Sequence, residues 1–443
     1  MTNEDWSRAI TKYGTDEEKP RPKFEIGGSL ELAEALGKRA AIEPQRFAEL
    51  ALTFDEQTPA SNIIAVINAV TGKVSPAQLT ELCEHAQRVA GEAAGQAICR
   101  AIANSADEAT DAMVDLLDHY SRATDPAAEL SFCRADGELD LATQGLNSTR
   151  GVAATAIGQV LFANDAHAPR LLPVVMELSQ DPILSVRAEA TRPVLALFNS
   201  HLEQALDIAD SLFDTSAIEI HHSRSANRLL KYALRDAGTR FARHLNRALE
   251  ADHHIAVRAG RIWAQLWLTN LLPEACPTEV IDLPSPVRLG AAQTVARAPH
   301  LALDVLIKLF DDEDAEVRKA AAAAIRVLDE PDSAMIRERL VAAYTCSQAF
   351  PDTYGELFHA LEGSNKLLPS TTIDACERAV EHAGGDLGDL SKASAATSRD
   401  IVTVVLRLYR QGDEPMRERC LDVIDQLADV GAYGLPEAIQ HER

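Results

Sequence analysis

Apolar side chains recur along much of this 443-residue chain at helical spacing, as pairs of stripes separated by a short polar turn. Apolar residues three or four positions apart lie on one face of an α-helix. Pairs of this kind occur near residues 171–197, 302–328 and 401–427, and the first consists of Leu171, Val174, Val175, Leu178, then Val186, Ala190, Val194 and Leu197. Neither helix of a pair can bury its apolar face alone, so the pairs must stack. We therefore predict an all-α solenoid of stacked antiparallel helix pairs.

A short motif marks the turn before several of the second helices. It is a polar or acidic turn, then an apolar residue and Arg, then an Ala-rich helix, and it begins at Asp181, His253, Ser285, Asp314 and, more weakly, Asp413. Repetition at a spacing of about 30–37 residues is typical of helical solenoids.

The turn Asp can cap the second helix and lies at the favourable end of its dipole. An Arg in the first helical turn is electrostatically unfavourable and needs a partner. We therefore expect a structural ladder of Asp–Arg pairs between stacked repeats, with the members Asp181, Arg187, Arg288, Asp314 and Arg318. The alternative is a row of Arg side chains that binds acidic partners.

Breaks in the pattern divide the chain into four segments: a polar arm or linker (1–28), degenerate helical repeats (29–143), regular repeats (144–383), and a loop, final hairpin and cap (384–443). Within the arm, Trp6, Ile10 and Tyr13 are spaced as one face of a short helix. That helix either docks on another protein or packs on the chain's own first repeat. An acidic stretch, 125–140, is expected to form a long loop.

Composition narrows the classes of partner. The formal net charge of -24 argues against a bulk nucleic-acid ligand, because such proteins present a basic patch. The seven Cys form no close metal-type pair, which favours reduced thiols. The N-terminus is polar, and no run of about 18 apolar residues predicts a membrane span. We expect a cytoplasmic protein with no cofactor and no membrane contact.

Two family resemblances refine this picture. The segment Leu-Leu-Pro-x-x-x-x-Leu…Asp-Pro-x-x-x-Val-Arg-x-x-Ala at 171–190 resembles a HEAT repeat, which implies a right-handed superhelix with the second helices on a concave face. The phrases at 144–154, 227–234, 403–409 and 420–425 resemble the C-terminal helical arrays of large bacterial NACHT- or STAND-like ATPases. That resemblance implies a sensor or assembly arm in anti-phage defence, associated with an ATPase component. The chain lacks the P-loop G-x-x-x-x-G-K-[ST] of that class.

Candidate chemistry concentrates in the middle of the chain. The pairs His221-His222 and His253-His254 suggest a transition-metal site, but they lack Cys or acidic residues at zinc-like spacing, so turn polarity or partner contact is favoured. Trp and Arg are enriched in binding hot spots. An aromatic pair four residues apart, such as Trp263 and Trp267, more often packs in the core, so it forms a binding patch only if a ring is exposed. The predicted partner-binding residues are His221, His222, Arg224, Arg228, His253, His254, Arg258, Arg261, Trp263 and Trp267. The acidic run 311–314 is predicted to be a solvated turn rather than a calcium site.

The sequence thus predicts a non-enzymatic scaffold or sensor that binds a protein partner along its second helices. Two alternatives stay open. A HEAT-type lyase or DNA glycosylase-like enzyme would have a deep pocket with a buried carboxylate. A nucleic-acid-binding solenoid would have a positive concave face and salt-sensitive affinity.

Overall fold

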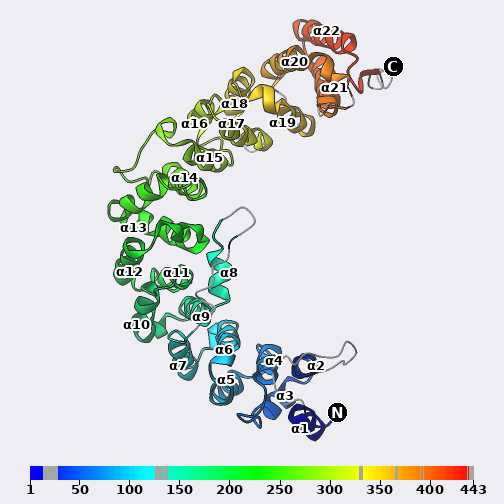
Figure 1. Ribbon diagram of the computed structural model, residues 1–443. Helices are drawn as coiled ribbons and strands as arrows, with labels where there is room; N and C mark the ends of the chain where they lie inside the picture. Colours follow the sequence, from blue (N-terminus) through cyan, green and yellow to red (C-terminus); the bar gives the residue numbers. More distant parts are fainter. Residues whose placement is uncertain are drawn as a thin grey trace. The chain divides into compact units, whose positions relative to one another are not determined.

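The computed structural model describes residues 1–12, 28–124, 133, 138–328, 333–364, 368–389, 391–392, 394–436 and 438. These residues form α-helices, short 3-10 helices and turns, with one isolated β-bridge between Cys133 and Leu139 (Figure 1). The chain divides into two compact units, Met1–Ala237 and Gly238–Arg443. Helix α13 (Arg224–Leu249) crosses the division and has a non-helical backbone at Ala237, where φ is -143° and ψ is 51°. The predicted all-α solenoid is confirmed.

Unit 1 contains twelve helices before α13 among its described residues. They are α1 (Asn3–Lys12), α2 (Ser29–Ala40), α3 (Pro44–Ala51), α4 (Ala60–Val70), α5 (Pro76–Ala90), α6 (Gly95–Ala103), α7 (Asp111–Tyr120), α8 (Leu141–Leu146), α9 (Thr149–Ala163), α10 (Ala168–Ser179), α11 (Leu184–Leu197) and α12 (Leu202–Thr215). Two rows result, because α4, α6, α9 and α11 contact one another in succession, as do α3, α5, α7, α10 and α12. We call the first of these the second-helix row of unit 1.

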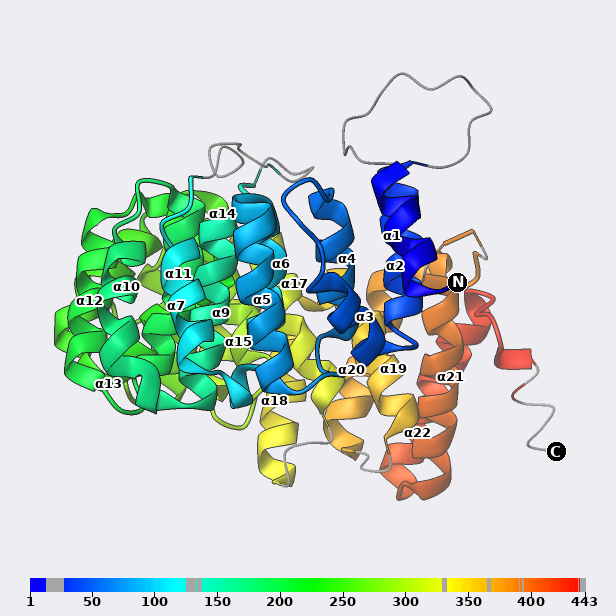
Figure 2. The ribbon, with the colours of Figure 1, turned by 90° about the horizontal axis from the view of Figure 1, so that it is seen from below.

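Unit 2 repeats this arrangement. Its helices after α13 are α14 (His253–Leu268), α15 (Ser285–Val295), α16 (Leu303–Phe310), α17 (Ala315–Ala322), α18 (Ala334–Cys346), α19 (Phe350–Gly363), α20 (Pro369–Ala383), α21 (Ser394–Gln411) and α22 (Glu414–Asp429). The second-helix row of unit 2 is α14, α15, α17, α19 and α21, and α16, α18, α20 and α22 form the other row. Figure 2 shows helices of each unit standing side by side.

The short N-terminal helix packs on its own unit. Trp6 and Ile10 are each 5% exposed, and the Trp6 ring meets the Phe47 ring edge-on at 5.8 Å. Arg46 adds hydrogen bonds to the side chain of Asn3 and the carbonyl of Met1, at 2.8 and 2.7 Å. Of the two interpretations of this helix, the structure therefore shows self-packing. The third predicted member of its face, Tyr13, lies outside the described residues.

Local signals in the sequence set many helix starts. Ser75 and Gln78 form a capping box at α5, and Asp314 and Asp413 accept backbone N–H bonds at the starts of α17 and α22. The Gly-, Ala- and Ser-rich residues 384–398, where the loop of the segment 384–443 was expected, are partly helical, because α21 already begins at Ser394.

The tightest helix crossing in unit 2 depends on two glycines. A Cβ on Gly260 of α14 would lie 2.1 Å from the Val287 carbonyl oxygen, and one on Gly290 of α15 would lie 1.9 Å from that of Val257. Any side chain at either position would force the two backbones apart.

Some sequence expectations fall where the structure gives no description. These are most of the polar arm (13–27), most of the acidic stretch (125–132 and 134–137) and the extreme C-terminus (439–443). The four segment boundaries stay predictions. None of the described helices combines the length and the apolar character needed to cross a bilayer.

Candidate functional site

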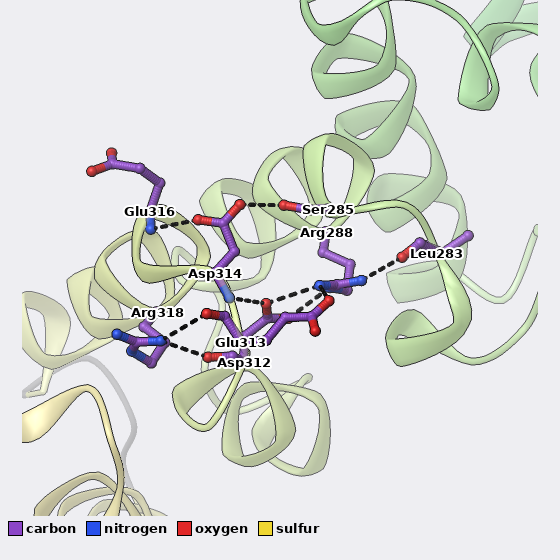
Figure 3. Close-up of polar contacts among 8 residues, drawn as sticks. All are labelled: Leu283, Ser285, Arg288, Asp312, Glu313, Asp314, Glu316 and Arg318. Atoms are coloured by element: carbon purple, nitrogen blue, oxygen red, sulfur yellow. Dashed lines mark hydrogen bonds and ion pairs between the residues drawn. The ribbon is translucent and has the colours of Figure 1, made fainter.

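The recurrent turn motif builds a buried ion pair in unit 2 rather than a surface ladder. Arg288 donates to both carboxylate oxygens of Asp312, at 2.7 and 3.0 Å, to Glu313 at 3.0 Å and to the Leu283 carbonyl at 2.7 Å (Figure 3). The Arg288 side chain is 8% exposed and that of Asp312 is fully buried. The prediction of a solvated turn at 311–314 is therefore wrong for Asp312, since Arg288 of the preceding repeat covers it.

Asp181 and Arg187, two further members of the expected ladder, contact residues outside it. Asp181 binds Arg150, with a closest approach of 2.8 Å, whereas Arg187 donates to the Thr215 carbonyl at 3.1 Å. Burial lowers the pKa of Arg187, and the charge of Asp181 opposes that shift. Each of these ion pairs thus joins an Arg of one repeat to the acidic turn of the next repeat. Arg150 was not among the ladder members that the sequence predicted.

Asp314 and Arg318 complete this region (Figure 3). Asp314 accepts hydrogen bonds from Ser285 and from the Glu316 backbone, and both lower its pKa. Arg318 donates to the Asp312 carbonyl at 2.8 Å and reaches Asp352 at 3.5 Å. These contacts connect the turn before α17 with α15 and α19, so they position the second helices of unit 2.

The histidine pair at 221–222 is built into unit 1. His221 is 3% exposed, stacks on Phe213 at 5.5 Å and bonds to Asn227 at 3.0 Å. The His222 side chain is 7% exposed and contacts Glu138 at 3.0 Å. Burial therefore removes both from the predicted partner-binding surface. Arg224 and Arg228 are exposed on α13, and the Arg228 guanidinium lies over the Tyr232 ring at 5.7 Å.

The remaining predicted partner-binding residues lie on α14 of unit 2. His253 and His254 are exposed at its capped start, Arg258 is half-buried, and Arg261 donates to Gln293 at 3.0 and 2.6 Å. The pair His221-His222 therefore lies in unit 1, whereas His253, His254 and both Trp residues lie in unit 2.

Trp263 is fully buried and donates its indole N–H to the Pro277 carbonyl at 2.7 Å. It stacks against the half-buried Trp267 at 6.3 Å. Trp263 is therefore a core residue, as the core interpretation of the Trp pair expected, and a partner-binding role for the other residues stays a prediction.

A groove of about 490 Å³ lies instead over three consecutive second helices of unit 2, α17 with its 3-10 extension (Ala323–Val327), α19 and α21. Most of the residues that line it have polar side chains, and they are Lys319, Ala323, Arg326, Asp352, Thr353, Tyr354, Gly355, Glu356, His359, Ser394, Ala396, Thr397 and Asp400. A Cβ on Gly355 would lie 2.9 Å from Thr397 Oγ1, so this glycine allows α19 and α21 to approach closely at the groove.

Charges in the groove are partly paired. Arg326 binds Glu356 through both carboxylate oxygens, with Nε to Oε2 at 2.6 Å. These hydrogen bonds lower the pKa of Glu356 and raise that of Arg326. Burial raises the pKa of Tyr354, whose ring packs against Phe350 at 5.9 Å. The groove therefore has a fixed charge pair beside an aromatic wall.

A second cluster lies at the far side of the same groove. Nδ1 of His359 on α19 is 3.8 Å from Oδ2 of Asp400 on α21, and Glu362 adds a carboxylate within 4.8 Å of both. Burial is the main cause that raises the pKa of Asp400, and the negative charge of the nearby Glu362 raises it further. Three groups that often bind cations thus converge on one point.

The corresponding surface of unit 1 is occupied by its own chain. Helix α8 packs against α9 and α11, and its C-terminal carbonyls at Leu146 and Asn147 accept bonds from Arg100 and Gln96 of α6, at 3.0 and 2.9 Å. A Cβ on Gly145 of α8 would lie 2.6 Å from Glu189 Cγ of α11, so the contact is close. A short helix therefore crosses three consecutive second helices of unit 1.

Sequence reasoning did not find the groove. Its residues are single polar positions on three helices, separated by about one repeat length, and no local motif unites them. The one available signal was the His-x-x-Glu spacing of His359 and Glu362, which places two donors on one helix face.

Comparison with known proteins supports the fold assignment. The HEAT repeat model matches residues 302–330, which contain α16 and α17. No curated protein matches the chain in sequence.

Three solved structures illustrate the likeness at low identity. Importin beta is 14% identical, with a TM-score of 0.37, over 99% of this chain and 59% of that one. The Kap95:Nup1 complex contains a chain that is 14% identical, with a TM-score of 0.40, over 97% of this chain and 68% of that one. The Pds5-Scc1 complex contains a chain that is 11% identical, with a TM-score of 0.28, over 92% of this chain and 74% of that one.

This chain thus spans about three fifths of the importin beta chain that it resembles. The repeat match coincides with a stacked helix pair that the structure shows independently. Residues 302–330 thus resemble a HEAT repeat, and they belong to an all-α helical solenoid.

Proposed function

We propose that the chain is a non-enzymatic scaffold that binds a short, basic segment of a partner protein in the groove over α17, α19 and α21. The observation that carries this proposal is the contrast between the two second-helix rows. The row of unit 1 is already crossed by a short helix, α8, whereas the row of unit 2 has an open groove of about 490 Å³. A row of this architecture can therefore seat a helical segment.

The charge of the chain favours a basic partner. The net charge is -24, and the groove contains three carboxylates, at Asp352, Glu356 and Asp400, against the two cations Lys319 and Arg326. Complementary charge speeds association and suppresses unsuitable partners. Binding should therefore weaken as salt is raised. The same charge disfavours nucleic acid, which requires a basic surface.

A groove-blocking variant tests this function. Ala396 lines the groove and is exposed, so Ala396→Trp would fill the space with little effect on folding. Ala428 is exposed on α22 in the other row, which makes Ala428→Trp a matched control. A partner is first identified by affinity purification and mass spectrometry, and its direct affinity is then measured by calorimetry.

The expected result is loss of the partner by Ala396→Trp and unchanged affinity for Ala428→Trp. Equal affinity of both variants and the parent chain would show that the partner binds elsewhere. Circular dichroism melting of all three proteins would separate loss of binding from loss of folding.

The setting of this interaction is proposed from the sequence resemblance alone. The resemblance to the helical arrays of NACHT- or STAND-like ATPases implies a bacterial, cytoplasmic anti-phage assembly in which this chain works with an ATPase component. Affinity purification from the producing host, with and without phage infection, should recover an ATPase in a phage-dependent manner. Recovery of the same partners under both conditions would remove the defence role while leaving the groove proposal intact.

A further inference from the structure

We propose that His359, Glu362 and Asp400 bind one divalent transition-metal ion of the zinc class at the edge of the unit 2 groove. This inference goes beyond the scaffold function, because it assigns a ligand to the chain itself. It concerns two neighbouring second helices, α19 and α21, that contact each other directly.

The donor geometry suits a single ion. His359 and Glu362 are three positions apart on α19, so they share a face, and Asp400 approaches from α21. Their donor atoms all lie within 4.8 Å of one another, and His359 Nδ1 is 3.8 Å from Asp400 Oδ2. Two ligands of a tetrahedral zinc ion lie about 3.4 Å apart, given bonds of about 2.0–2.1 Å. Small side-chain rotations therefore complete the site.

The charges at this point favour a cation. Asp400 is a partly buried carboxylate, with its side chain 19% exposed, and the Glu362 carboxylate lies beside it. Two like charges in contact repel each other, and a positive ion between them converts that repulsion into attraction. Arg399 is a cation that acts on Asp400, and it lowers the pKa of that carboxyl less than burial raises it. The Arg326 guanidinium, which lines the groove, is already engaged by Glu356.

The ligand set also selects the class of metal. An imidazole with two carboxylates suits zinc and similar transition metals, whereas calcium and magnesium prefer oxygen ligands alone. The acidic turn at 312–314 differs in this respect, because it has no imidazole and Arg288 neutralises Asp312. Three protein ligands leave a coordination position for water or for a donor from a bound partner.

Such an ion would join α19 to α21 at the groove. His359 and Asp400 both line the groove, so the open position of the metal would face the space that a partner occupies. The ion would therefore fix the groove edge and offer a contact to an incoming carboxylate or imidazole.

Zinc titration of the purified full chain, with any affinity tag removed, tests the site. Calorimetry should show one saturable site, and His359→Ala and Asp400→Asn should each weaken it at least about tenfold, the loss typical even of residues one layer outside the ligands. His300→Ala and Asp422→Asn alter an exposed histidine and an exposed aspartate elsewhere in unit 2, and both should bind zinc as the parent chain does.

Cobalt substitution distinguishes this site from the exposed thiols of Cys133 and Cys346. Cobalt bound by nitrogen and oxygen should give visible absorption without the strong near-ultraviolet band of a thiolate complex. Zinc should also raise the melting temperature of the parent chain and not that of His359→Ala, which a purely structural histidine would not explain.

Two results would overturn the proposal: no saturable zinc binding, or equal zinc affinity of His359→Ala, Asp400→Asn and the two control variants. Neither result depends on a protein partner. Failure of the metal site can therefore be told apart from failure of the scaffold function.

Discussion

The second-helix rows of the two units are built alike and end up with different surfaces. In unit 1, α8 covers part of α6, α9 and α11, whereas in unit 2 the row of α17, α19 and α21 has an open polar groove. The two surfaces differ because different residues line them. Glycines at 145 and 151 let α8 approach closely, while Arg326 and Glu356 project an ion pair into the groove. The comparison shows that one repeat architecture can have a covered surface or an open groove.

The largest expected effect concerns the ion pairs that hold the rows in register. Arg288→Met should lower the free energy of unfolding by about 3–5 kcal/mol, because it strands the fully buried Asp312 carboxylate. Arg150→Met should cost less, since the Arg150 side chain is 17% exposed and water can reach the site. Urea unfolding of both variants measures the difference. Equal losses would show that the two units depend on these pairs to the same degree.

The next effect tests why α8 fits on unit 1. A Cβ on Gly151 would lie 2.2 Å from the Gly145 carbonyl oxygen, so Gly151→Ala should cost about 1–3 kcal/mol by overpacking. Gly385→Ala, where a Cβ meets nothing within 4 Å, is the control. Differential scanning calorimetry would report the change. A melting temperature unchanged from the parent would mean that α8 is not held closely.

A pH effect is expected from the acid beneath α8. Burial raises the pKa of Glu189, although Thr155 donates to it at 2.9 Å and Arg192 lies 2.9 Å away. A carboxyl group with a raised pKa contributes stability below its ordinary pKa of about 4.5 and loses that contribution as the pH rises through its folded value.

Glu189→Gln should therefore gain stability relative to the parent chain between pH 4 and pH 8. Melting temperatures of both proteins across this range give the measurement, and Glu203→Gln, at an exposed position of α12, is the control. A constant difference between variant and parent at every pH would contradict the expectation.

The smallest effect on stability is expected in the groove itself. Arg326→Ala removes an exposed ion pair, which should cost at most about 1 kcal/mol. The groove should nevertheless become more acidic and bind a basic partner more tightly. Urea unfolding and calorimetry with the identified partner separate the two effects. A large loss of stability would place Arg326 among the structural residues instead of the binding residues.

Prediction from the sequence succeeded where the information is local. Apolar spacing located the helix pairs, and the turn Asp residues 314 and 413 were correctly expected to cap α17 and α22. It failed where burial depends on a neighbouring repeat. Asp312 belongs to a turn with four acidic positions, and nothing in that turn shows that the Arg288 guanidinium will enclose it.

The candidate site shows the same division. His221 and Trp263 looked suitable for binding because of their residue types, yet both are buried among residues of their own unit. His359 and Asp400 attracted no attention, because they are 41 residues apart and only the contact of α19 with α21 brings them within 3.8 Å.

The sequence by itself determined an all-α solenoid, its turn caps and the acidic character of the molecule, because these follow from periodicity, local hydrogen bonding and composition. The tertiary structure decided which charges are buried, which row is covered and where the groove lies. Those properties arise from contacts between residues about one repeat or more apart, and the distance between two side chains on stacked helices is not encoded in either helix alone.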